Sequence, residues 1–168
     1  MAIVASASAG KHAAARATIL QLRAPGLNAR DLESNANELV GASPVPVLIS
    51  SRCDVALAAG AAGVNLPERD ITVADARAFL GQRIIGRSVH SLQAALEAEA
   101  DGADFVIFGP VWISESHSGS APAGIEALAE IARTLHIPVL AIGGVTEERI
   151  VECHAAGAAG YAAIRLFQ

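Results

Sequence analysis

Residues 59–64 read Ala-Gly-Ala-Ala-Gly-Val, and two later stretches echo them: Ala-Asp-Gly-Ala-Asp-Phe at 100–105 and Ala-Gly-Ala-Ala-Gly-Tyr at 156–161. Each stretch places glycine just before a short apolar run. Glycine suits the left-handed residue that ends a helix, and alanine keeps the turn into the following strand tight. The echoes therefore predict a repeated helix-to-strand unit.

Outward from these turns, runs of β-branched residues alternate with alanine-rich segments of helical period. The expected strands are Thr18–Arg23, Val45–Ser50, Gly63–Leu66, Arg83–Ser88, Asp104–Gly109, Ile137–Ile142 and Gly160–Ile164. The expected helices are Ala29–Val40, Ser51–Ala59, Val73–Leu80, Ser91–Ala100, Gly124–Leu135 and Glu147–Ala156. Because strands that are apolar on both faces alternate with helices, we expect a parallel sheet covered by helices.

Repeated units of this kind build either a (β/α)8 TIM barrel or a doubly wound sheet. A doubly wound sheet is typically marked by a GxGxxG or GxxxxGK[ST] turn, and neither pattern occurs. We therefore expect one α/β barrel domain over residues 1–168. Complete barrels usually need at least about 200 residues, so this one is expected to be shortened at both termini. Its first strand would be Ala2–Ala5, its last would end at Ile164, and a partner chain could cover the exposed ends.

The composition is typical of one buried core. The chain has 168 residues, 52% of them hydrophobic, and a net charge of −5. An acidic chain without a basic cluster argues against nucleic acid and against an anionic membrane as partner. No apolar run approaches the roughly 20 residues of a membrane helix. Cys53 and Cys153 fit no CxxC pattern, so we expect buried free thiols in a reducing cytoplasm.

In a barrel of this kind the chemistry lies where strands end and the following loops begin. Gln21 and Arg23 end one expected strand, and an amide beside a guanidinium can bind an anionic or heteroaromatic ligand. The alternative is a surface arginine paired with a carboxylate. Ser88 and His90 end another expected strand, where they either donate hydrogen bonds to a ligand or cap the next helix.

The stretch Ile-Ser-Glu-Ser-His-Ser-Gly-Ser at 113–120 is rich in hydroxyls and predicts a lid over the site. Ser114 and Ser116 would point the same way in an extended loop and suit phosphate oxygens, while His117 adds a titratable group. A solvated loop without a role is the alternative. Trp112, just before it, is either a wall for a flat ring or a cover for the core.

Gly143 and Gly144 follow the seventh expected strand and precede a helix. Paired glycines let backbone N–H groups approach a phosphate, helped by the positive end of the helix. The loops after strands seven and eight commonly hold phosphate in such barrels. Ile164 and Arg165 end the last strand, where Arg165 either adds a cation to the expected phosphate site or is a surface charge near the chain end.

Five ordered motifs now resemble those of the thiamine phosphate synthase/TenI family over roughly residues 18–164. They are Ile-Leu-Gln-Leu-Arg at 19–23, the stretch 54–64, Gly-Arg-Ser-Val-His-Ser at 86–91, the stretch 102–111 and Ala-Ile-Gly-Gly-Val at 141–145. The resemblance implies a phosphate-binding barrel of thiamin biosynthesis. Synthases of the family join a hydroxymethylpyrimidine diphosphate to a thiazole phosphate with Mg²⁺ and release pyrophosphate. The TenI branch isomerises a thiazole phosphate without a metal.

The chain departs from the synthase pattern at several positions. The lysine of Q-L-R-x-K is absent, because Ala24-Pro25 follows Arg23, and I-N-D reads Ile49-Ser50-Ser51. Ser51 thus stands where a carboxylate binds Mg²⁺, whereas the second metal carboxylate of the family falls on Asp70. The lid motif T-x-T-K reads Ser-Glu-Ser-His at 114–117. The tautomerase histidine after the sixth strand is also missing, since Pro110 stands there and cannot transfer a proton.

Three functions remain open on these residues. The first is a TenI-like isomerisation of a thiazole phosphate, with His117 or His90 as the acid–base group; the second is thiamine phosphate synthesis with Asp70 and Mg²⁺; the third is a non-catalytic thiamin-phosphate binder or regulator. The missing lysine and carboxylate favour the TenI-like function, for which no cofactor is expected. The resemblance also implies a homodimer.

Overall fold

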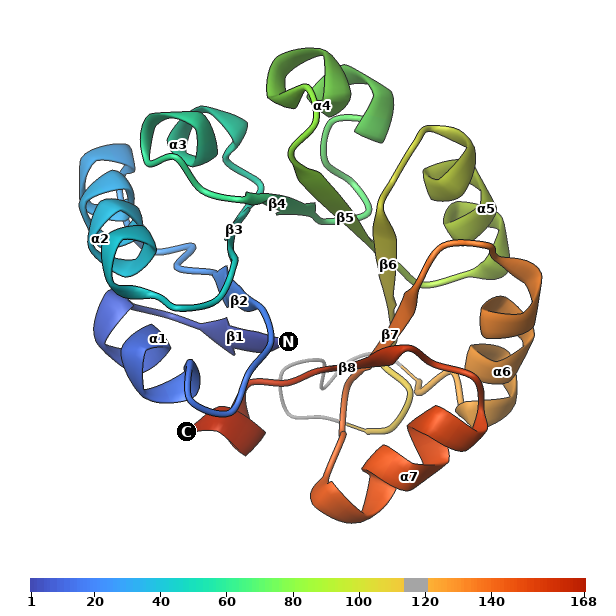
Figure 1. The fold of residues 1–168 in the computed structure, drawn as a ribbon. Coiled ribbons are helices and arrows are strands. Elements are labelled where there is room, and N and C mark those ends of the chain that lie inside the picture. Colours follow the sequence, from blue (N-terminus) through green and yellow to red (C-terminus); the bar gives the residue numbers. More distant parts are fainter. Residues whose placement is uncertain (114–120) are drawn as a thin grey trace.

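The computed structural model describes residues 1–113 and 121–168, which form a barrel of parallel strands inside a ring of helices (Figure 1). The sheet has eight strands in chain order, and each pairs with its neighbours in parallel. Their bounds are β1 Ala2–Val4, β2 Leu20–Leu22, β3 Val47–Ser50, β4 Gly63–Leu66, β5 Ile84–Val89, β6 Phe105–Phe108, β7 Val139–Ile142 and β8 Gly160–Ala162. The predicted (β/α)8 fold is confirmed.

The barrel closes between its first and last strands. The Ile3 N–H donates to the Ala163 carbonyl at 2.9 Å, and the Ala163 N–H donates to the Met1 carbonyl at 3.2 Å. The terminal ammonium of Met1 also donates to the Tyr161 carbonyl at 2.7 Å. Ala2–Val4 is therefore a full member of the sheet although it has only three residues.

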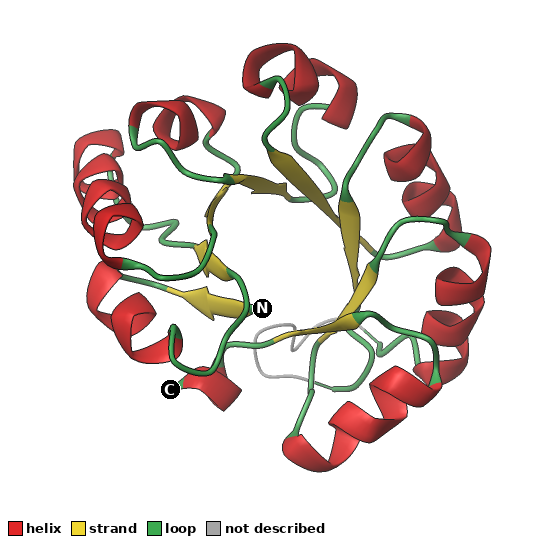
Figure 2. Cartoon of the chain, viewed as in Figure 1, coloured by secondary structure: helices red, strands yellow, loops and turns green. Residues whose placement is uncertain are grey.

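Helices follow the strands around the outside (Figure 2). They are α1 Ala7–Ala13, α2 Ala29–Ala42, α3 Cys53–Ala58, α4 Val73–Leu80, α5 Leu92–Ala100, α6 Ile125–Thr134 and α7 Glu147–Ala155, with the short 3-10 helix η2 at Arg165–Phe167 after β8. The expected helices thus form, with ends shifted by one or two residues, and α1 is an addition. Within the described residues, no helix is long and apolar enough to cross a membrane.

Side chains alternate between two cores. Those on the outward face of the strands, such as Leu20, Leu22 and Val64, pack against the helices. Those on the inward face, among them Ile3, Leu48 and Phe105, form a separate cluster inside the barrel. Successive residues of a strand point to opposite faces of the sheet. A residue that lies between two residues of the outer core therefore points into the barrel.

Both cysteines are free, as predicted. Cys153 is buried, whereas Cys53 is only half-buried, because it begins the short helix α3 at the rim of the barrel.

Candidate active site

Every strand runs in the same direction, so all the carboxyl ends meet at one rim of the barrel. Arg23 follows β2, His90 follows β5, Gly143 follows β7 and Ile164 follows β8. The structure thus places the predicted ligand-binding and phosphate-binding residues at one rim. Ser114, Ser116 and His117 lie outside the described residues.

The inward-facing side chains divide the barrel into a polar and an apolar half. Gln21 lies between the outward-facing Leu20 and Leu22, so its amide faces the interior. The same alternation turns the side chains of β3, β4 and β5 inward at Ser50, Asn65 and Ser88, respectively. On the opposite wall, the inward residues Ile107, Leu140, Ile142 and Ile164 are apolar. One face of the interior therefore offers hydrogen bonds and the other offers a hydrophobic surface.

Two buried acceptors of the polar half have no partner among the described residues. Gln21 is 2% exposed and Asn65 is 3% exposed, and Gln21 Oε1 and Asn65 Oδ1 accept no hydrogen bond. The other end of the Asn65 amide is used, because its Nδ2 donates to Ser88 Oγ at 3.0 Å. An unsatisfied buried acceptor costs about 1–3 kcal/mol. Both acceptors face the same interior, where a ligand with N–H donors or an ordered water could satisfy them.

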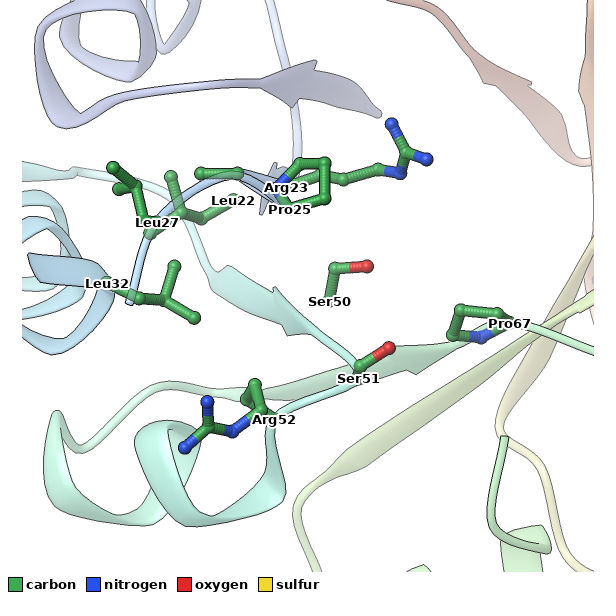
Figure 3. Close-up of a pocket in the computed structure, with 10 residues that line it drawn as sticks. Leu22, Arg23, Pro25, Leu27, Leu32, Ser50, Ser51, Arg52 and Pro67 are labelled. Carbon is green, nitrogen blue, oxygen red and sulfur yellow. The ribbon is translucent and has the colours of Figure 1, made fainter. Parts of the chain in front are cut away.

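A cavity of about 330 Å³ opens beside this polar half, between the loops that follow β2 and β3. Arg23, Ser50, Ser51 and Arg52 provide its polar lining, and the remaining lining is apolar or proline. Figure 3 shows the Arg23 guanidinium and the hydroxyls of Ser50 and Ser51 extending toward the Pro67 side, whereas the Arg52 guanidinium turns the other way.

The two arginines of the cavity differ in their partners. Arg52 Nε donates to Asp54 Oδ1 at 2.8 Å, and its Nη2 donates to the other carboxylate oxygen, so its charge is already offset. Arg23 is exposed, and its guanidinium makes no hydrogen bond or ion pair with any described residue. The alternative of a surface arginine paired with a carboxylate does not apply to Arg23 within the described chain, and its charge remains available to an anion.

The diglycine corner is packed against the loop after β6. The Val111 N–H donates to the Ile142 carbonyl at 2.9 Å, and the Trp112 N–H donates to the Gly143 carbonyl at 3.0 Å. Gly144 has a φ of +68°, and a Cβ there would lie 2.7 Å from the Ile113 carbonyl oxygen. Only glycine fits this close approach without strain. The amides of Gly143 and Gly144 donate to no described residue, so they remain free for a ligand.

The helix that follows the corner, α7, carries acidic residues in its first turn, where a phosphate would meet its positive end. Glu147 and Glu148 occupy the first turn of α7, so their carboxylates already offset the positive end of the helix dipole. A phosphate at this corner would therefore rely on the glycine amides rather than on α7. Trp112 is half-buried against the outer core and lies under the guanidinium of Arg149, 5.0 Å from its ring centroid, so it acts as core cover.

His90 is held by a carboxylate at the rim. Glu68 Oε2 accepts from the His90 backbone N–H at 2.6 Å and lies 2.8 Å from His90 Nδ1. Arg87 fixes the loop that carries Glu68 by donating to the Glu68 and Ile71 carbonyls, at 2.6 Å each. The capping role considered for Ser88 and His90 belongs to neither, because Ser91 caps α5 by accepting from the Ala94 N–H.

The described residues do not fit a Mg²⁺ site. Ser51 supplies a neutral hydroxyl where the synthase pattern has a carboxylate, and a hydroxyl does not offset the charge of the ion. One oxygen of Asp70 is occupied by the Ile71 N–H at 2.8 Å. Within the described residues, no three Asp, Glu, His or Cys side chains gather closely enough to hold a metal. Asp70 alone therefore does not make the predicted metal site.

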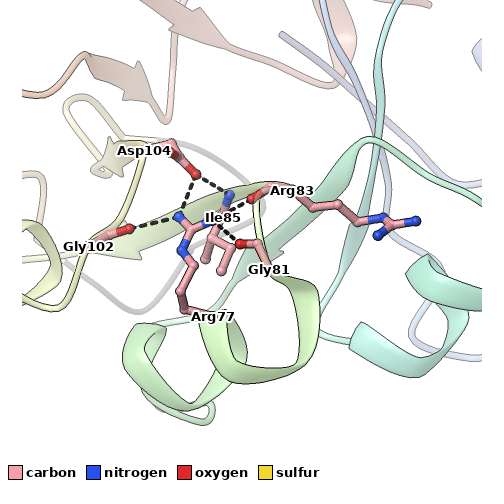
Figure 4. Close-up of polar contacts among 6 residues, drawn as sticks. All are labelled: Arg77, Gly81, Arg83, Ile85, Gly102 and Asp104. Carbon is pink, nitrogen blue, oxygen red and sulfur yellow. Dashed lines mark hydrogen bonds and ion pairs between the residues drawn. The ribbon is translucent and has the colours of Figure 1, made fainter.

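A second polar cluster lies at the opposite rim, where helices lead into strands, and it stabilises the fold (Figure 4). Arg77 of α4 donates to Asp104 Oδ2 at 2.8 Å, and that same oxygen accepts from the Ile85 N–H at 2.7 Å. Arg77 also donates to the carbonyls of Gly81, Arg83 and Gly102. Because the Arg77 guanidinium donates to all of these groups, the cluster holds α4 against β5 and the start of β6.

The sequence did not mark Asn65 as a site residue, and it marked Ser50 and Ser51 only as departures from the synthase pattern. Asn65 and Ser50 sit inside apolar strands, and only the inward alternation reveals that they face the interior. Ser51 adopts a φ of 66°, the one non-glycine residue in the described chain with positive φ. A hydroxyl-rich strand end was the available signal, but Ser-Ser is too common in turns to stand out.

Comparison with known proteins agrees with this architecture. The family model described as thiamine monophosphate synthase matches residues 5–167, and the chain belongs to this family. Its members are enzymes of thiamin biosynthesis. The match does not separate the synthases from the TenI branch.

Three relatives illustrate the similarity. A Geobacter sulfurreducens protein named "Putative thiamine-phosphate synthase" is 45% identical over 150 residues, which cover 86% of this chain and 70% of that protein. A Chloroflexus aurantiacus protein named thiamine-phosphate synthase is 35% identical over 97% of this chain and 73% of its own length. The solved structure of a thiamine phosphate pyrophosphorylase from Pyrococcus furiosus superposes with a TM-score of 0.88 at 30% identity, covering 97% of this chain and 83% of that one.

Proposed function

We propose that this chain couples an aminopyrimidine diphosphate to a thiazole phosphate and so forms thiamine phosphate, rather than isomerising the thiazole alone. The observation that carries the proposal is that Gln21 Oε1 and Asn65 Oδ1, on the polar wall beside the Arg23 guanidinium, have no partner among the described residues. An aminopyrimidine supplies N–H donors, and a diphosphate supplies the anion. A thiazole phosphate by itself leaves the two acceptors unused.

Each group then has one role in the coupling. The amide oxygens of Gln21 and Asn65 orient the pyrimidine by accepting hydrogen bonds from its amino group. The thiazole nitrogen attacks the methylene carbon of the pyrimidine, the bond from that carbon to the diphosphate oxygen breaks, and pyrophosphate leaves with the electron pair. Arg23 stabilises the charge that grows on the leaving group. The apolar wall of Ile107, Leu140 and Ile142 covers the rings.

The diglycine corner provides the second binding site of this proposal. The free amides of Gly143 and Gly144 are suited to the oxygens of a phosphate ester, with the chain at Ile164 and Arg165 across the same rim. The names of relatives with 35% and 45% identity support coupling as well. Pro110 supports it further, since it leaves no acid–base group at the position of the tautomerase histidine.

A second candidate is thiazole isomerisation, and the observation that favours it is the pair of Glu68 and His90. A carboxylate within 2.8 Å of Nδ1 holds the ring and leaves its other nitrogen for proton transfer. His117 is the other predicted acid–base group, and Ser114 and Ser116 are the predicted phosphate ligands of the lid. We also propose that the chain forms a homodimer and acts in the cytoplasm.

Titration calorimetry distinguishes coupling of two substrates from isomerisation of one. We expect hydroxymethylpyrimidine and thiazole phosphate to bind together, one of each per chain. Gly144→Asp places a negative charge at the corner and should abolish binding of the thiazole phosphate, whereas Gly144→Ala, which strains the same backbone without a charge, should weaken it less. Binding of thiazole phosphate alone, with hydroxymethylpyrimidine ignored, would count against coupling and in favour of isomerisation.

A further inference from the structure

The cavity beside β2 and β3 carries the chemistry of an anion site and lacks the chemistry of a metal site. Its polar lining consists of two arginines and two serines, with no carboxylate. Arg52 is committed to Asp54, so Arg23 supplies the available positive charge within the described lining. The hydroxyls of Ser50 and Ser51 project to the same side as the Arg23 guanidinium (Figure 3).

We propose that this cavity binds the diphosphate of the substrate directly, without a divalent cation, through Arg23 and the hydroxyls of Ser50 and Ser51. The inference rests on the proposed coupling, and it says how that same site neutralises its anion. A guanidinium and hydroxyl donors bind phosphate oxygens through charge-assisted hydrogen bonds. A carboxylate at position 51 would instead repel a diphosphate unless a cation stood between them.

The backbone at Ser51 makes the proposal testable by exchange of one residue. Its φ of 66° is held by the Ser51 N–H, which donates to the Asn65 carbonyl at 3.1 Å, and by the Arg52 N–H, which donates to the Ser50 carbonyl at 2.8 Å. Asp and Asn tolerate this left-handed conformation better than most residues. Ser51→Asp and Ser51→Asn are therefore expected to fold, and they differ from each other in charge and hardly in shape.

In the synthase pattern that the chain resembles, the two metal carboxylates fall on positions 51 and 70, and the chain keeps the second as Asp70. A carboxylate introduced at position 51 together with Asp70 would provide the two acidic ligands that Mg²⁺ prefers.

The test is titration calorimetry of the full chain with inorganic pyrophosphate, once in EDTA and once with Mg²⁺ in excess. We expect the wild-type chain to bind pyrophosphate in EDTA, and Arg23→Gln to weaken that binding about tenfold or more. Ser51→Asp should lose about tenfold in EDTA and recover with Mg²⁺, whereas Ser51→Asn should bind in EDTA much as the wild type does. Melting curves of all variants confirm that each is folded.

The inference is overturned if the wild type binds pyrophosphate only with Mg²⁺, if it binds none in either buffer, or if Arg23→Gln binds as well as the wild type. Its failure is distinguishable from that of the proposed function. Coupling that requires Mg²⁺ would keep the function and remove the inference. Binding of pyrophosphate in EDTA by a chain that never couples the two substrates would keep the anion site and remove the function.

Discussion

Gln21→Met tests the interior site by moving stability and binding in opposite directions. Gln21 is 2% exposed, and its Oε1 has no partner among the described residues. Methionine keeps the unbranched shape and nearly the same length, so it removes the buried acceptor without leaving a cavity. Relief of an unsatisfied acceptor is worth about 1–2 kcal/mol. For a chain of this size, that raises the melting temperature by about 2–8 °C.

The same change should cost the site a hydrogen bond to its ligand. An N–H donor of hydroxymethylpyrimidine that loses its acceptor inside the barrel weakens binding by about 1–2 kcal/mol, which is about tenfold in Kd. The assays are thermal unfolding of the free chain and calorimetric titration with hydroxymethylpyrimidine.

Leu20→Met is the matched control, because Leu20 is the preceding residue on β2, faces the helices and does not line the cavity. It should lower stability by less than about 1.5 kcal/mol and leave Kd unchanged. If Gln21→Met melts no higher than the wild type and binds hydroxymethylpyrimidine equally well, the interior of the barrel is not the pyrimidine site.

Three further predictions concern the fold. Gly144→Ala should lower the free energy of unfolding in urea by about 1–3 kcal/mol, because it combines a φ of +68° with a Cβ that lies 2.7 Å from the Ile113 carbonyl oxygen. Gly26→Ala should change it little, because a Cβ there meets nothing within 4 Å. Equal effects of the two substitutions would contradict the close approach at Gly144. Arg77→Leu should lower the free energy of unfolding in urea by about 1–2 kcal/mol, because it removes the ion pair with Asp104. Lys11→Leu, which removes an exposed ion pair with Glu38, should lower it by less than about 1 kcal/mol. The reverse order would show that the Asp104 network is not stabilising. Burial raises the pKa of the Glu99 carboxyl, but hydrogen bonds from the backbone N–H groups of His136 and Ile137 outweigh burial, so the pKa is lowered in the folded chain. The Glu99 carboxylate therefore stabilises the fold at pH values above its unfolded pKa of about 4.3. This stabilisation is lost as the pH falls through the lower pKa of the folded state. The advantage of the wild type over Glu99→Gln should therefore shrink between about pH 6 and pH 3, and a constant difference in unfolding free energy would refute it.

Much of the barrel could be predicted because most strand residues are apolar and because β4, β6 and β8 each follow a glycine turn. The helix α1 escaped prediction because Ala7–Ala13 contains no large apolar side chain to show a helical period. Its start is set instead by Ser6, whose side chain accepts from the Ala9 N–H. The sequence predicted a barrel but not the hydrogen bonds that close it, since these join residues at the two ends of the chain.

The site was predictable only in part, for a related reason. Gln21, Arg23 and the diglycine corner lie at strand ends, where sequence order alone assigns a rim. The hydrogen-bonding of Asn65 and the lack of a partner for the Arg23 guanidinium among the described residues could not be predicted, because both depend on side chains far away in sequence. The carboxylate that holds His90 comes from Glu68, 22 residues earlier, and no local pattern encodes such a pair.

Turnover of the substrate pair tests the central claim most directly. The full chain is incubated with hydroxymethylpyrimidine diphosphate and thiazole phosphate, and separately with the thiazole tautomer, and the products are followed by mass spectrometry and NMR. We predict thiamine phosphate and an equal amount of pyrophosphate from the pair, and no change in the tautomer. An isomerised thiazole with no thiamine phosphate, or ligands that bind and remain unaltered in both reactions, would contradict the account.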